Sequence, residues 1–253
     1  MSDLQGRLAL VIGAAAGIGL ASAQALAERG ATVMLADRNG DAAEQAADAL
    51  RAGGAEAVSY EADASSLPQL RGLFDFVDKK YGKLNVLFAN VGMRGPDGFD
   101  VTEEQFDAVF NLNLKSHFFA ASYAIPLLRR CAPHASIIFM SSAGGLRLGG
   151  RCPLYSISKA GVVMMARAFA RELGPHGIRV NALCPGAIET AFPRWSGLGE
   201  AEYRAAIDRG GRNVPLGRIG QPQDVAGVVT FLASDQSGYL TGLAIPVDGG
   251  ELA

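Results

Sequence analysis

The sequence predicts an α/β protein: a single-domain Rossmann fold, with one doubly wound, seven-stranded parallel sheet and helices on both faces. Short apolar runs alternate with longer helical segments along the whole chain, which is the order of a βαβ fold. The strand-like runs are continuously apolar, as expected for strands that are buried on both faces of a sheet. The chain has 253 residues, of which 49% are hydrophobic, so it is long enough to bury a large core.

The periodicity assigns each segment in turn. Seven apolar runs are expected to form strands: residues 8–12, 32–36, 57–60, 86–89, 136–140, 179–183 and 243–247. Six segments are expected to form helices: residues 18–29, 41–51, 67–81, 102–130, 154–173 and 222–233. Helix ends carry recognisable signals, since Gly30 suits a C-cap, Pro68 a first turn and Thr102 the start of a capping box with Gln105. No repeat or low-complexity linker divides the chain, and we expect one domain over residues 1–253.

Residues 191–215 form the least regular stretch, with several glycines, Pro193 and Trp195 around a short helical piece at residues 200–208. A loop of this length inside a compact domain is usually a lid or a binding loop. We therefore expect it to be the substrate loop.

Composition excludes several classes of function. The net charge of −2 argues against a nucleic-acid or membrane partner that is held by bulk charge. The cysteines Cys131, Cys152 and Cys184 and the three histidines lack the spacing of a metal site or a disulfide framework, so we expect no metal and a cytoplasmic setting. The uncharged run at residues 8–27 resembles a signal peptide, but its glycines and the acidic residue before it favour a soluble strand–turn–helix.

A glycine-rich turn follows the first strand and opens the first helix, with Gly13, Gly17 and Gly19. Glycines at this place let the backbone approach a pyrophosphate, and the helix N-terminus supplies N–H donors. The second strand is followed by Asp37, 18 residues after Gly19. A carboxylate there accepts hydrogen bonds from the adenosine ribose and repels a 2′-phosphate. The pattern favours NAD(H).

A second signal is Tyr155 with Lys159 four residues later, which places both side chains on one face of a helix. A phenol has a pKa of about 10. A cation about 4 Å away stabilises the phenolate by about 4 kcal/mol at an effective dielectric of about 20. We therefore expect Lys159 to lower the pKa of Tyr155 by roughly three pKa units. Ser142 follows the apolar strand at residues 136–140, where it faces the ligand crevice of a parallel sheet.

The order and spacing of these motifs resemble those of the short-chain dehydrogenases/reductases, in the branch of about 250 residues. The resemblance covers nearly the whole chain. The resemblance implies a catalytic set of Asn113, Ser142, Tyr155 and Lys159. It further implies a cofactor site made of Gly13, Ala16, Gly17, Ile18, Gly19, Asp37, Arg38, Asp63, Ala64, Asn90, Gly92, Tyr155, Lys159, Pro185, Gly186, Ile188 and Thr190. The segment from Pro185 to Thr190 lies near the nicotinamide in that family, and Asp248-Gly249-Gly250 matches its closing motif.

Two positions depart from the family pattern. Ile12 replaces a threonine before the glycine-rich turn, and Val91 stands where the family's Asn-Asn-Ala-Gly segment has alanine; the first Asn of that segment is Ala89 here. Replacing polar groups on both sides of a contact by apolar ones strands no buried partner. We interpret the departures as a local repacking and expect Asn90 and Gly92 still to shape the adenosine pocket.

The resemblance implies an NAD-dependent oxidoreductase that interconverts a secondary alcohol and a ketone, with Tyr155 as acid/base, Ser142 holding the substrate and Asn113 keeping a water beside Lys159. Two alternatives stay open: an NADPH-dependent 3-oxoacyl-carrier-protein reductase, and a non-catalytic dinucleotide-binding scaffold. Asp37 argues against the first and the complete catalytic set against the second.

The surfaces raise two further hypotheses. Apolar residues surround the predicted helix at residues 154–173, among them Met164, and a helix that is apolar on two faces suggests burial by another subunit; a homotetramer is the family's usual assembly. Four arginines fall in segments on the substrate side: Arg94, Arg147, Arg151 and Arg194. One or two of them would select an anionic substrate; the alternative is that arginine simply replaces lysine on solvated surfaces, since arginines outnumber lysines 18 to 5. Otherwise Met93, Leu146 and Trp195 suggest an apolar or cyclic alcohol.

Overall fold

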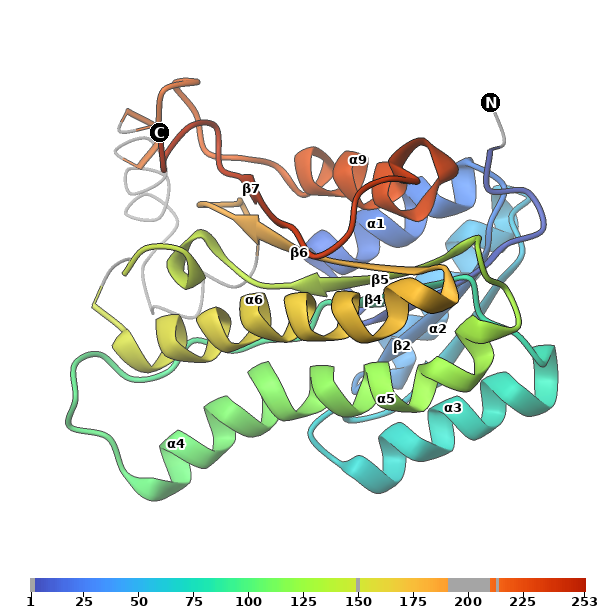
Figure 1. Ribbon diagram of the computed structural model, residues 1–253, viewed down its shortest axis with the longest axis horizontal. Helices are drawn as coiled ribbons and strands as arrows, with labels where there is room; N and C mark the ends of the chain where they lie inside the picture. Colours follow the sequence, from blue (N-terminus) through green and yellow to red (C-terminus); the bar gives the residue numbers. More distant parts are fainter. Residues whose placement is uncertain (1–2, 149–150, 191–209, 213) are drawn as a thin grey trace.

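Seven parallel strands form one sheet in the order β3-β2-β1-β4-β5-β6-β7 in a computed structural model of the chain (Figure 1). The structure describes residues 3–148, 151–190, 210–212 and 214–253. The strands are β1 (Leu8–Ile12), β2 (Thr32–Asp37), β3 (Ala57–Glu61), β4 (Val86–Ala89), β5 (Ala135–Met140), β6 (Ile178–Pro185) and β7 (Ala244–Val247). This topology confirms the predicted fold class, and every strand lies within two residues of its predicted bounds.

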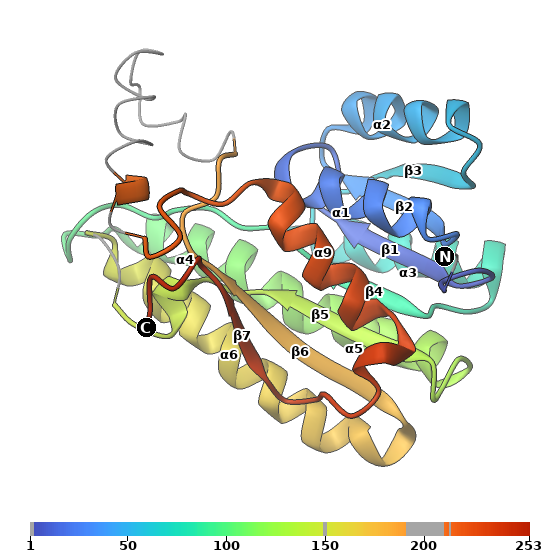
Figure 2. The same cartoon turned by 90° about the horizontal axis from the view of Figure 1, so that it is seen from above.

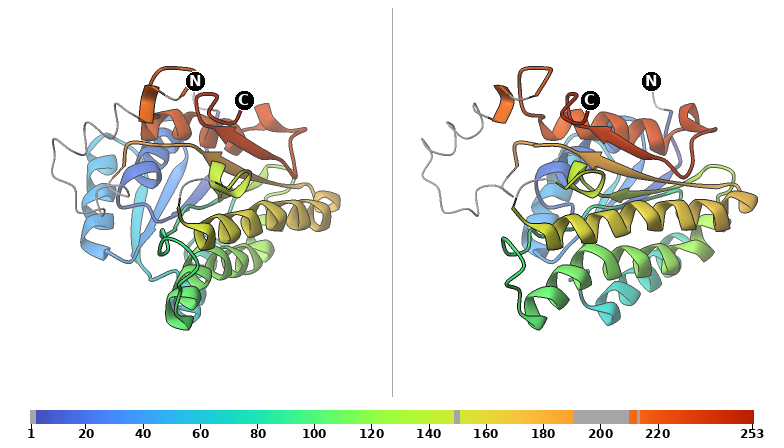
Figure 3. Two further views of the ribbon diagram at one scale, coloured as in Figure 1. Left: turned by 90° about the vertical axis from the view of Figure 1, so that its left-hand side faces the viewer. Right: turned by 60° about the vertical axis from the view of Figure 1, so that its left-hand side comes forward.

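Helices cover both faces of the sheet. They are α1 (Gly17–Glu28), α2 (Gly40–Ala52), α3 (Leu67–Tyr81), α4 (Glu103–Phe110), α5 (Ser116–Arg129), α6 (Pro153–Leu173) and α9 (Pro222–Ala233), together with short helical turns that include Asn111–Lys115 and Ala143–Gly145. Helices α3, α5 and α6 contribute to one buried apolar cluster, and α1, α2 and α9 to the other (Figures 2 and 3). Strand residues with no exposed surface, such as Leu10 and Val11, divide between the two clusters, as the continuous apolar runs predict.

The predicted helix at residues 102–130 is divided in the structure. Thr102 caps α4 with the expected capping box to Gln105, but residues Asn111–Lys115 form a π-helical turn before α5 begins. A π turn holds one residue more than an α turn and is common at functional sites. Here the wide turn contains Asn113, whose side chain is bound to a neighbouring loop. Apolar periodicity did not predict this interruption, because it coincides with contacts that Asn113 makes to residues distant in sequence.

The expected substrate loop at residues 191–215 lies largely outside the described residues, as does its predicted helical piece. The chain on either side of it is described. Ile188 pairs with Gly220 in an isolated parallel bridge, and the Leu216 N–H donates to the Gly249 carbonyl at 3.1 Å. Both ends of the segment are therefore held at the carboxyl end of the sheet.

Candidate active site

The glycine-rich turn between β1 and α1 is built for close backbone approach. Gly13 and Gly17 have φ values of +83° and +55°, in the region that favours glycine. A Cβ at Gly19 would lie 1.9 Å from the Gly13 carbonyl oxygen, so no other residue fits there. Ala16 provides no side-chain cap to α1, and the first turn holds no acidic residue. The N–H groups of Gly17 and Ile18 thus open a cradle that fits a pyrophosphate.

Asp37 lies directly beside this cradle, at the end of β2. Its Oδ2 accepts a hydrogen bond from the Ala15 N–H at 3.0 Å, and its Oδ1 accepts one from the Asn39 N–H at 3.0 Å. Arg38, next in the chain, is exposed. On the neighbouring strand connection, Asp63 accepts from both the N–H and the hydroxyl of Ser65. The cofactor residues predicted at these two strand ends therefore share one edge of the sheet.

Ala64, also predicted at the cofactor site, is buried and belongs to the apolar cluster under α3. It contributes shape to this edge rather than a polar contact.

The segment that departs from the family pattern contacts the glycine-rich turn directly. Asn90 Nδ2 donates to the Gly13 carbonyl oxygen at 3.0 Å, and Val91 packs against Gly13, with its Cγ1 3.0 Å from a Cβ placed there. Ile12 is buried, with 2% of its surface exposed. Asn90 therefore supports the glycine-rich turn. Gly92 lies against Lys159, since a Cβ on Gly92 would be 3.0 Å from Lys159 Nζ.

Asn113 is fully buried in the π turn, and both ends of its side-chain amide are used. Its Oδ1 accepts from the Met93 N–H at 2.8 Å, and its Nδ2 donates to the Met93 carbonyl at 2.9 Å and to Ser158 Oγ at 3.0 Å. The Ser158 hydroxyl in turn donates to the Tyr155 carbonyl at 2.7 Å. Asn113 thus ties the loop after β4 to the helix that carries Tyr155 and Lys159.

The predicted catalytic set converges at the carboxyl end of β5. Ser142 follows the strand and accepts from the Gly144 N–H at 3.1 Å, and its hydroxyl is hydrogen-bonded to the Tyr155 phenol. Lys159 is 2% exposed, and its Nζ donates to the Met140 carbonyl at 2.9 Å. That nitrogen lies 5.8 Å from the centre of the Tyr155 ring. The structure therefore brings together Asn113, Ser142, Tyr155 and Lys159.

The electrostatics of this set differ from the sequence-based expectation. Burial raises the pKa of Tyr155, and the hydrogen bond from Ser142 only partly opposes that rise. Burial also lowers the pKa of Lys159 from 10.5 to about 7. The expected lowering of the Tyr155 pKa by Lys159 was wrong, because the i,i+4 spacing indicates proximity but not the desolvation that burial imposes on the phenol.

The segment after β6 reaches the glycine-rich turn from the other side. Thr190 Cγ2 would lie 3.4 Å from a Cβ on Gly17, so two motifs that are far apart in sequence form one wall. Ile188 is buried, and Gly186 packs against Asp248, whose Cβ would be 2.9 Å from a Cβ on Gly186. Pro185 is the last residue of β6.

Two of the four arginines on the substrate side are engaged by acidic residues. Arg94 forms an ion pair with Asp97. Arg147 lies 3.9 Å from Glu251 and also donates to the Glu251 carbonyl at 3.3 Å. Arg151 is exposed and makes no ion pair within the described part of the chain, and Arg194 is outside that part.

Two functional neighbours were missed by the sequence analysis. Ser158 holds Asn113, and its position directly before Lys159 was a signal that could have been used. His117 is fully buried, with Nδ1 3.1 Å from Ser116 Oγ. Burial and nearby Lys159 hold the pKa of His117 well below its ordinary value. No sequence signal distinguishes this histidine from one buried in a core.

Comparisons with known proteins agree with this geometry. A profile of the family described as Enoyl-(Acyl carrier protein) reductase matches residues 13–251. A crystal structure of a short-chain type dehydrogenase/reductase from Mycobacterium marinum is similar with a TM-score of 0.90 and 34% identity, covering 99% of this chain and 97% of that one. This chain belongs to the short-chain dehydrogenase/reductase family.

Two curated members of the short-chain dehydrogenase/reductase family illustrate its range. A 3-oxoacyl-[acyl-carrier-protein] reductase of Thermotoga maritima is 38% identical over 251 residues, covering 98% of each chain. A galactitol 2-dehydrogenase of Agrobacterium fabrum is 34% identical over 256 residues, again covering 98% of each. The resemblance and the predicted fold are thus confirmed, and the chain is an oxidoreductase of a family that uses nicotinamide dinucleotides.

Two features are absent from the residues that the structure describes. None of their helices is both long and apolar enough to span a membrane. Among the same residues, no group of three or more histidine, cysteine, aspartate or glutamate side chains is placed to hold a metal ion.

Proposed function

We propose that this chain is a cytoplasmic, NAD(H)-dependent dehydrogenase that interconverts a secondary alcohol and a ketone, with Tyr155 as the acid/base. The observation that carries the proposal is the convergence of Ser142, Tyr155, Lys159 and Asn113 beside a glycine-rich turn that is free to bind a pyrophosphate. A scaffold that only bound a dinucleotide would need the turn but not this set.

NAD⁺, when bound, supplies the acceptor for the substrate's hydride. Ser142 orients the substrate hydroxyl, and Tyr155 takes its proton; this role requires charged Lys159 and the positive nicotinamide to offset the rise that burial gives the pKa of the phenol. Lys159 has three N–H donors in its charged form, of which one is used by the Met140 carbonyl. The others are available to the ribose and to the proton path from Tyr155. Asn113 keeps the loop at Met93 in place, which lets its own π turn hold a water beside Lys159.

The choice of NAD(H) over NADP(H) is supported by Asp37. Its carboxylate is held beside the cradle by the N–H groups of Ala15 and Asn39. A fixed carboxylate pairs with ribose hydroxyls and repels a phosphate at the same place.

The decisive test compares Tyr155→Phe with wild type. We expect NADH binding, measured by fluorescence titration, to change less than about threefold, because the ring still packs. We expect kcat with a secondary-alcohol substrate found by screening to fall at least about 100-fold. Tyr239→Phe is the matched control, since this tyrosine is fully exposed. A Tyr155→Phe variant with more than a tenth of wild-type kcat contradicts the acid/base role.

A second candidate is favoured by the 38% identity to a 3-oxoacyl-[acyl-carrier-protein] reductase. That function predicts preference for NADPH and reduction of β-ketoacyl thioesters. Steady-state assays with both cofactors on a β-ketoacyl thioester and on a panel of polyols, sugars and secondary alcohols separate the two. A chain that turns over none of them with either cofactor would instead fit the scaffold function.

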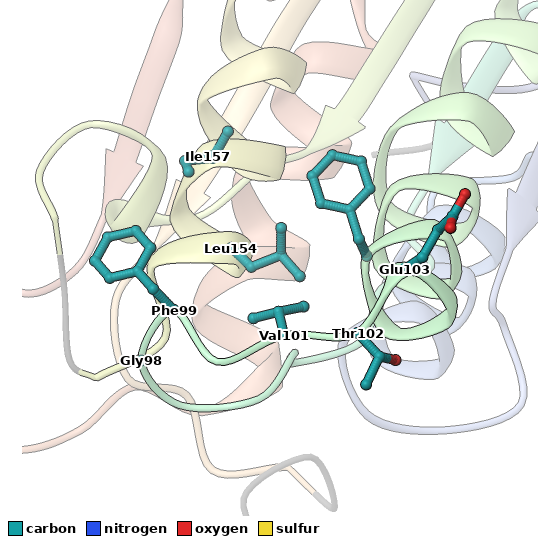
Figure 4. A pocket seen from close by; sticks show the side chains of 8 residues that line it. Gly98, Phe99, Val101, Thr102, Glu103, Leu154 and Ile157 are labelled. Carbon is teal, nitrogen blue, oxygen red and sulfur yellow. The ribbon is translucent and has the colours of Figure 1, made fainter.

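We further propose a homotetramer. Several large apolar side chains on α4, α5 and α6 are exposed: Phe106, Phe118, Ile157 and Met164. Beside them, an apolar pocket of about 480 Å³ opens between the loop before α4 and the first turns of α6 (Figure 4). None of the four catalytic candidates lines this pocket, whereas Phe106 and Ile157 of the exposed apolar set do. Exposed apolar faces of this kind support burial by a second copy.

A further inference from the structure

The end of β3 carries a carboxylate that the proposed cofactor site has not used. We infer that Glu61 is a second specificity determinant, which acts with Asp37 to exclude cofactors that carry a 2′-phosphate. This inference rests on the proposed function, because it takes the adenosine ribose to bind at Asp37.

Strand register places the two carboxylates side by side. Asp37 and Glu61 are paired residues of the parallel strands β2 and β3, and both are the last residues of their strands. The Ala62 N–H donates to the Asp37 carbonyl at 2.9 Å, which continues the pairing past the strand end. Paired residues of neighbouring strands present their side chains on the same face of the sheet. Glu61 therefore belongs to the same edge as Asp37.

The Glu61 side chain folds over the start of α2. A Cβ added to Gly40 would lie 2.6 Å from Glu61 Oε2 and 3.0 Å from Glu61 Cβ. Gly40 is the first residue of α2, so the carboxylate lies at the positive end of a helix. An anion is stabilised at that place, which means that Glu61 occupies a position that would otherwise attract a phosphate.

Two N–H donors near the start of α2 are already used within the chain. Asn39 donates its N–H to Asp37 Oδ1 at 3.0 Å, and its own side chain accepts from the Ala42 N–H at 3.1 Å. Arg38 is the cation in this turn, and its exposed guanidinium has no acidic partner in the described chain. A 2′-phosphate would gain the Arg38 guanidinium but would lie close to the two carboxylates of Asp37 and Glu61.

The test measures the ratio of dissociation constants for NADPH and NADH by fluorescence titration, without any substrate. Glu61→Gln removes the charge and keeps the size of the side chain. Glu56→Gln is the matched control, because exposed Glu56 directly precedes β3, at the end of the strand opposite Glu61, and its carboxylate accepts a hydrogen bond from the Thr32 hydroxyl. Asp37→Asn reports on the proposed cofactor site independently.

We expect Glu61→Gln to lower the NADPH/NADH ratio of dissociation constants about tenfold, with NADH affinity within twofold of wild type. Glu56→Gln should leave the ratio within twofold. Raising the salt concentration should lower the NADPH/NADH ratio of dissociation constants more in wild type than in Glu61→Gln, because salt screens the repulsion by the exposed carboxylate.

Three outcomes overturn the inference in distinguishable ways. If Asp37→Asn lowers the ratio and Glu61→Gln does not, Glu61 has no role but the proposed cofactor site stands. If Glu61→Gln weakens both cofactors equally, the residue is structural. If the wild-type protein binds neither cofactor, or prefers NADPH, the proposed function fails and this inference fails with it.

Discussion

Replacing Lys159 by methionine should stabilise the cofactor-free protein near neutral pH while it abolishes catalysis. Lys159 is almost completely buried, and burial lowers its pKa from 10.5 to about 7. In the unfolded chain the lysine keeps its ordinary pKa, so between these values the unfolded state binds more protons than the folded state. The contribution of Lys159 to folding is therefore unfavourable at low pH and becomes less so as the pH rises.

The size of the effect follows from the two pKa values. Burial of Lys159 costs about 4 kcal/mol at pH 7 and about 1 kcal/mol at pH 10. Methionine has a similar length and no charge, but it leaves the Met140 carbonyl without its donor, which costs about 1–3 kcal/mol at either pH. We expect Lys159→Met to be about 1–3 kcal/mol more stable than wild type at pH 7, and this advantage to fall by about 3 kcal/mol by pH 10.

The assay is urea unfolding followed by circular dichroism at pH 7 and pH 10, at one protein concentration and without cofactor. Only the difference between variant and wild type is interpreted, since titrating groups away from Lys159 contribute equally to both. Burial keeps His117, whose pKa Lys159 also helps to lower, neutral at both pH values. Lys79→Met, at an exposed position on α3, is the control and should show no such pH dependence. A stability difference for Lys159→Met that is the same at both pH values within about 1 kcal/mol refutes the desolvation argument.

Three further predictions concern the site and the surface. Ser142→Ala removes the hydroxyl that is bonded to the Tyr155 phenol, and we expect kcat to fall about 100-fold with NADH binding unchanged. A rise in the substrate KM with kcat unchanged would instead assign Ser142 to substrate binding. Arg151→Ala should lower kcat/KM for an acidic alcohol about tenfold relative to a matched neutral alcohol if the substrate is anionic, and equal losses discard the anionic class. Met164→Glu, which places a charge on an apolar position that is 59% exposed, should reduce the mass measured by light scattering; an unchanged mass excludes this face from the assembly.

Most of the fold was predictable because strong local signals and tertiary structure agree. The continuous apolar runs identified all seven strands of the described sheet, and the capping box at Thr102 identified the start of α4. The π turn at Asn111–Lys115 was not predictable. It widens the helix by one residue without changing the apolar pattern, and the buried contacts of Asn113 with Met93 and Ser158 become visible only when distant segments meet.

The identities of the candidate site residues were predictable, whereas their energetics were not. Spacing placed Tyr155 and Lys159 on one helix face, and the strand end placed Ser142 beside them. Whether a cation lowers a neighbour's pKa depends on how much solvent each group loses, and that quantity belongs to the packed structure. Glu61 is a similar case, because its importance depends on the strand register with Asp37 and on its contact with Gly40.

The burial of Lys159 explains why this part of the chain is so heavily braced. A lysine that is kept away from water destabilises the fold, so its surroundings must be fixed by other contacts. The Ser141 hydroxyl donates to the Lys159 carbonyl at 2.8 Å, and a Cβ on Gly145 would lie 2.7 Å from the Lys159 carbonyl carbon, so the turn after β5 packs directly on the lysine's own backbone. Asn113 fixes the opposite side through Ser158. These contacts fix the position of Lys159, and the stability lost by burying the lysine is offset by the apolar clusters on both faces of the sheet.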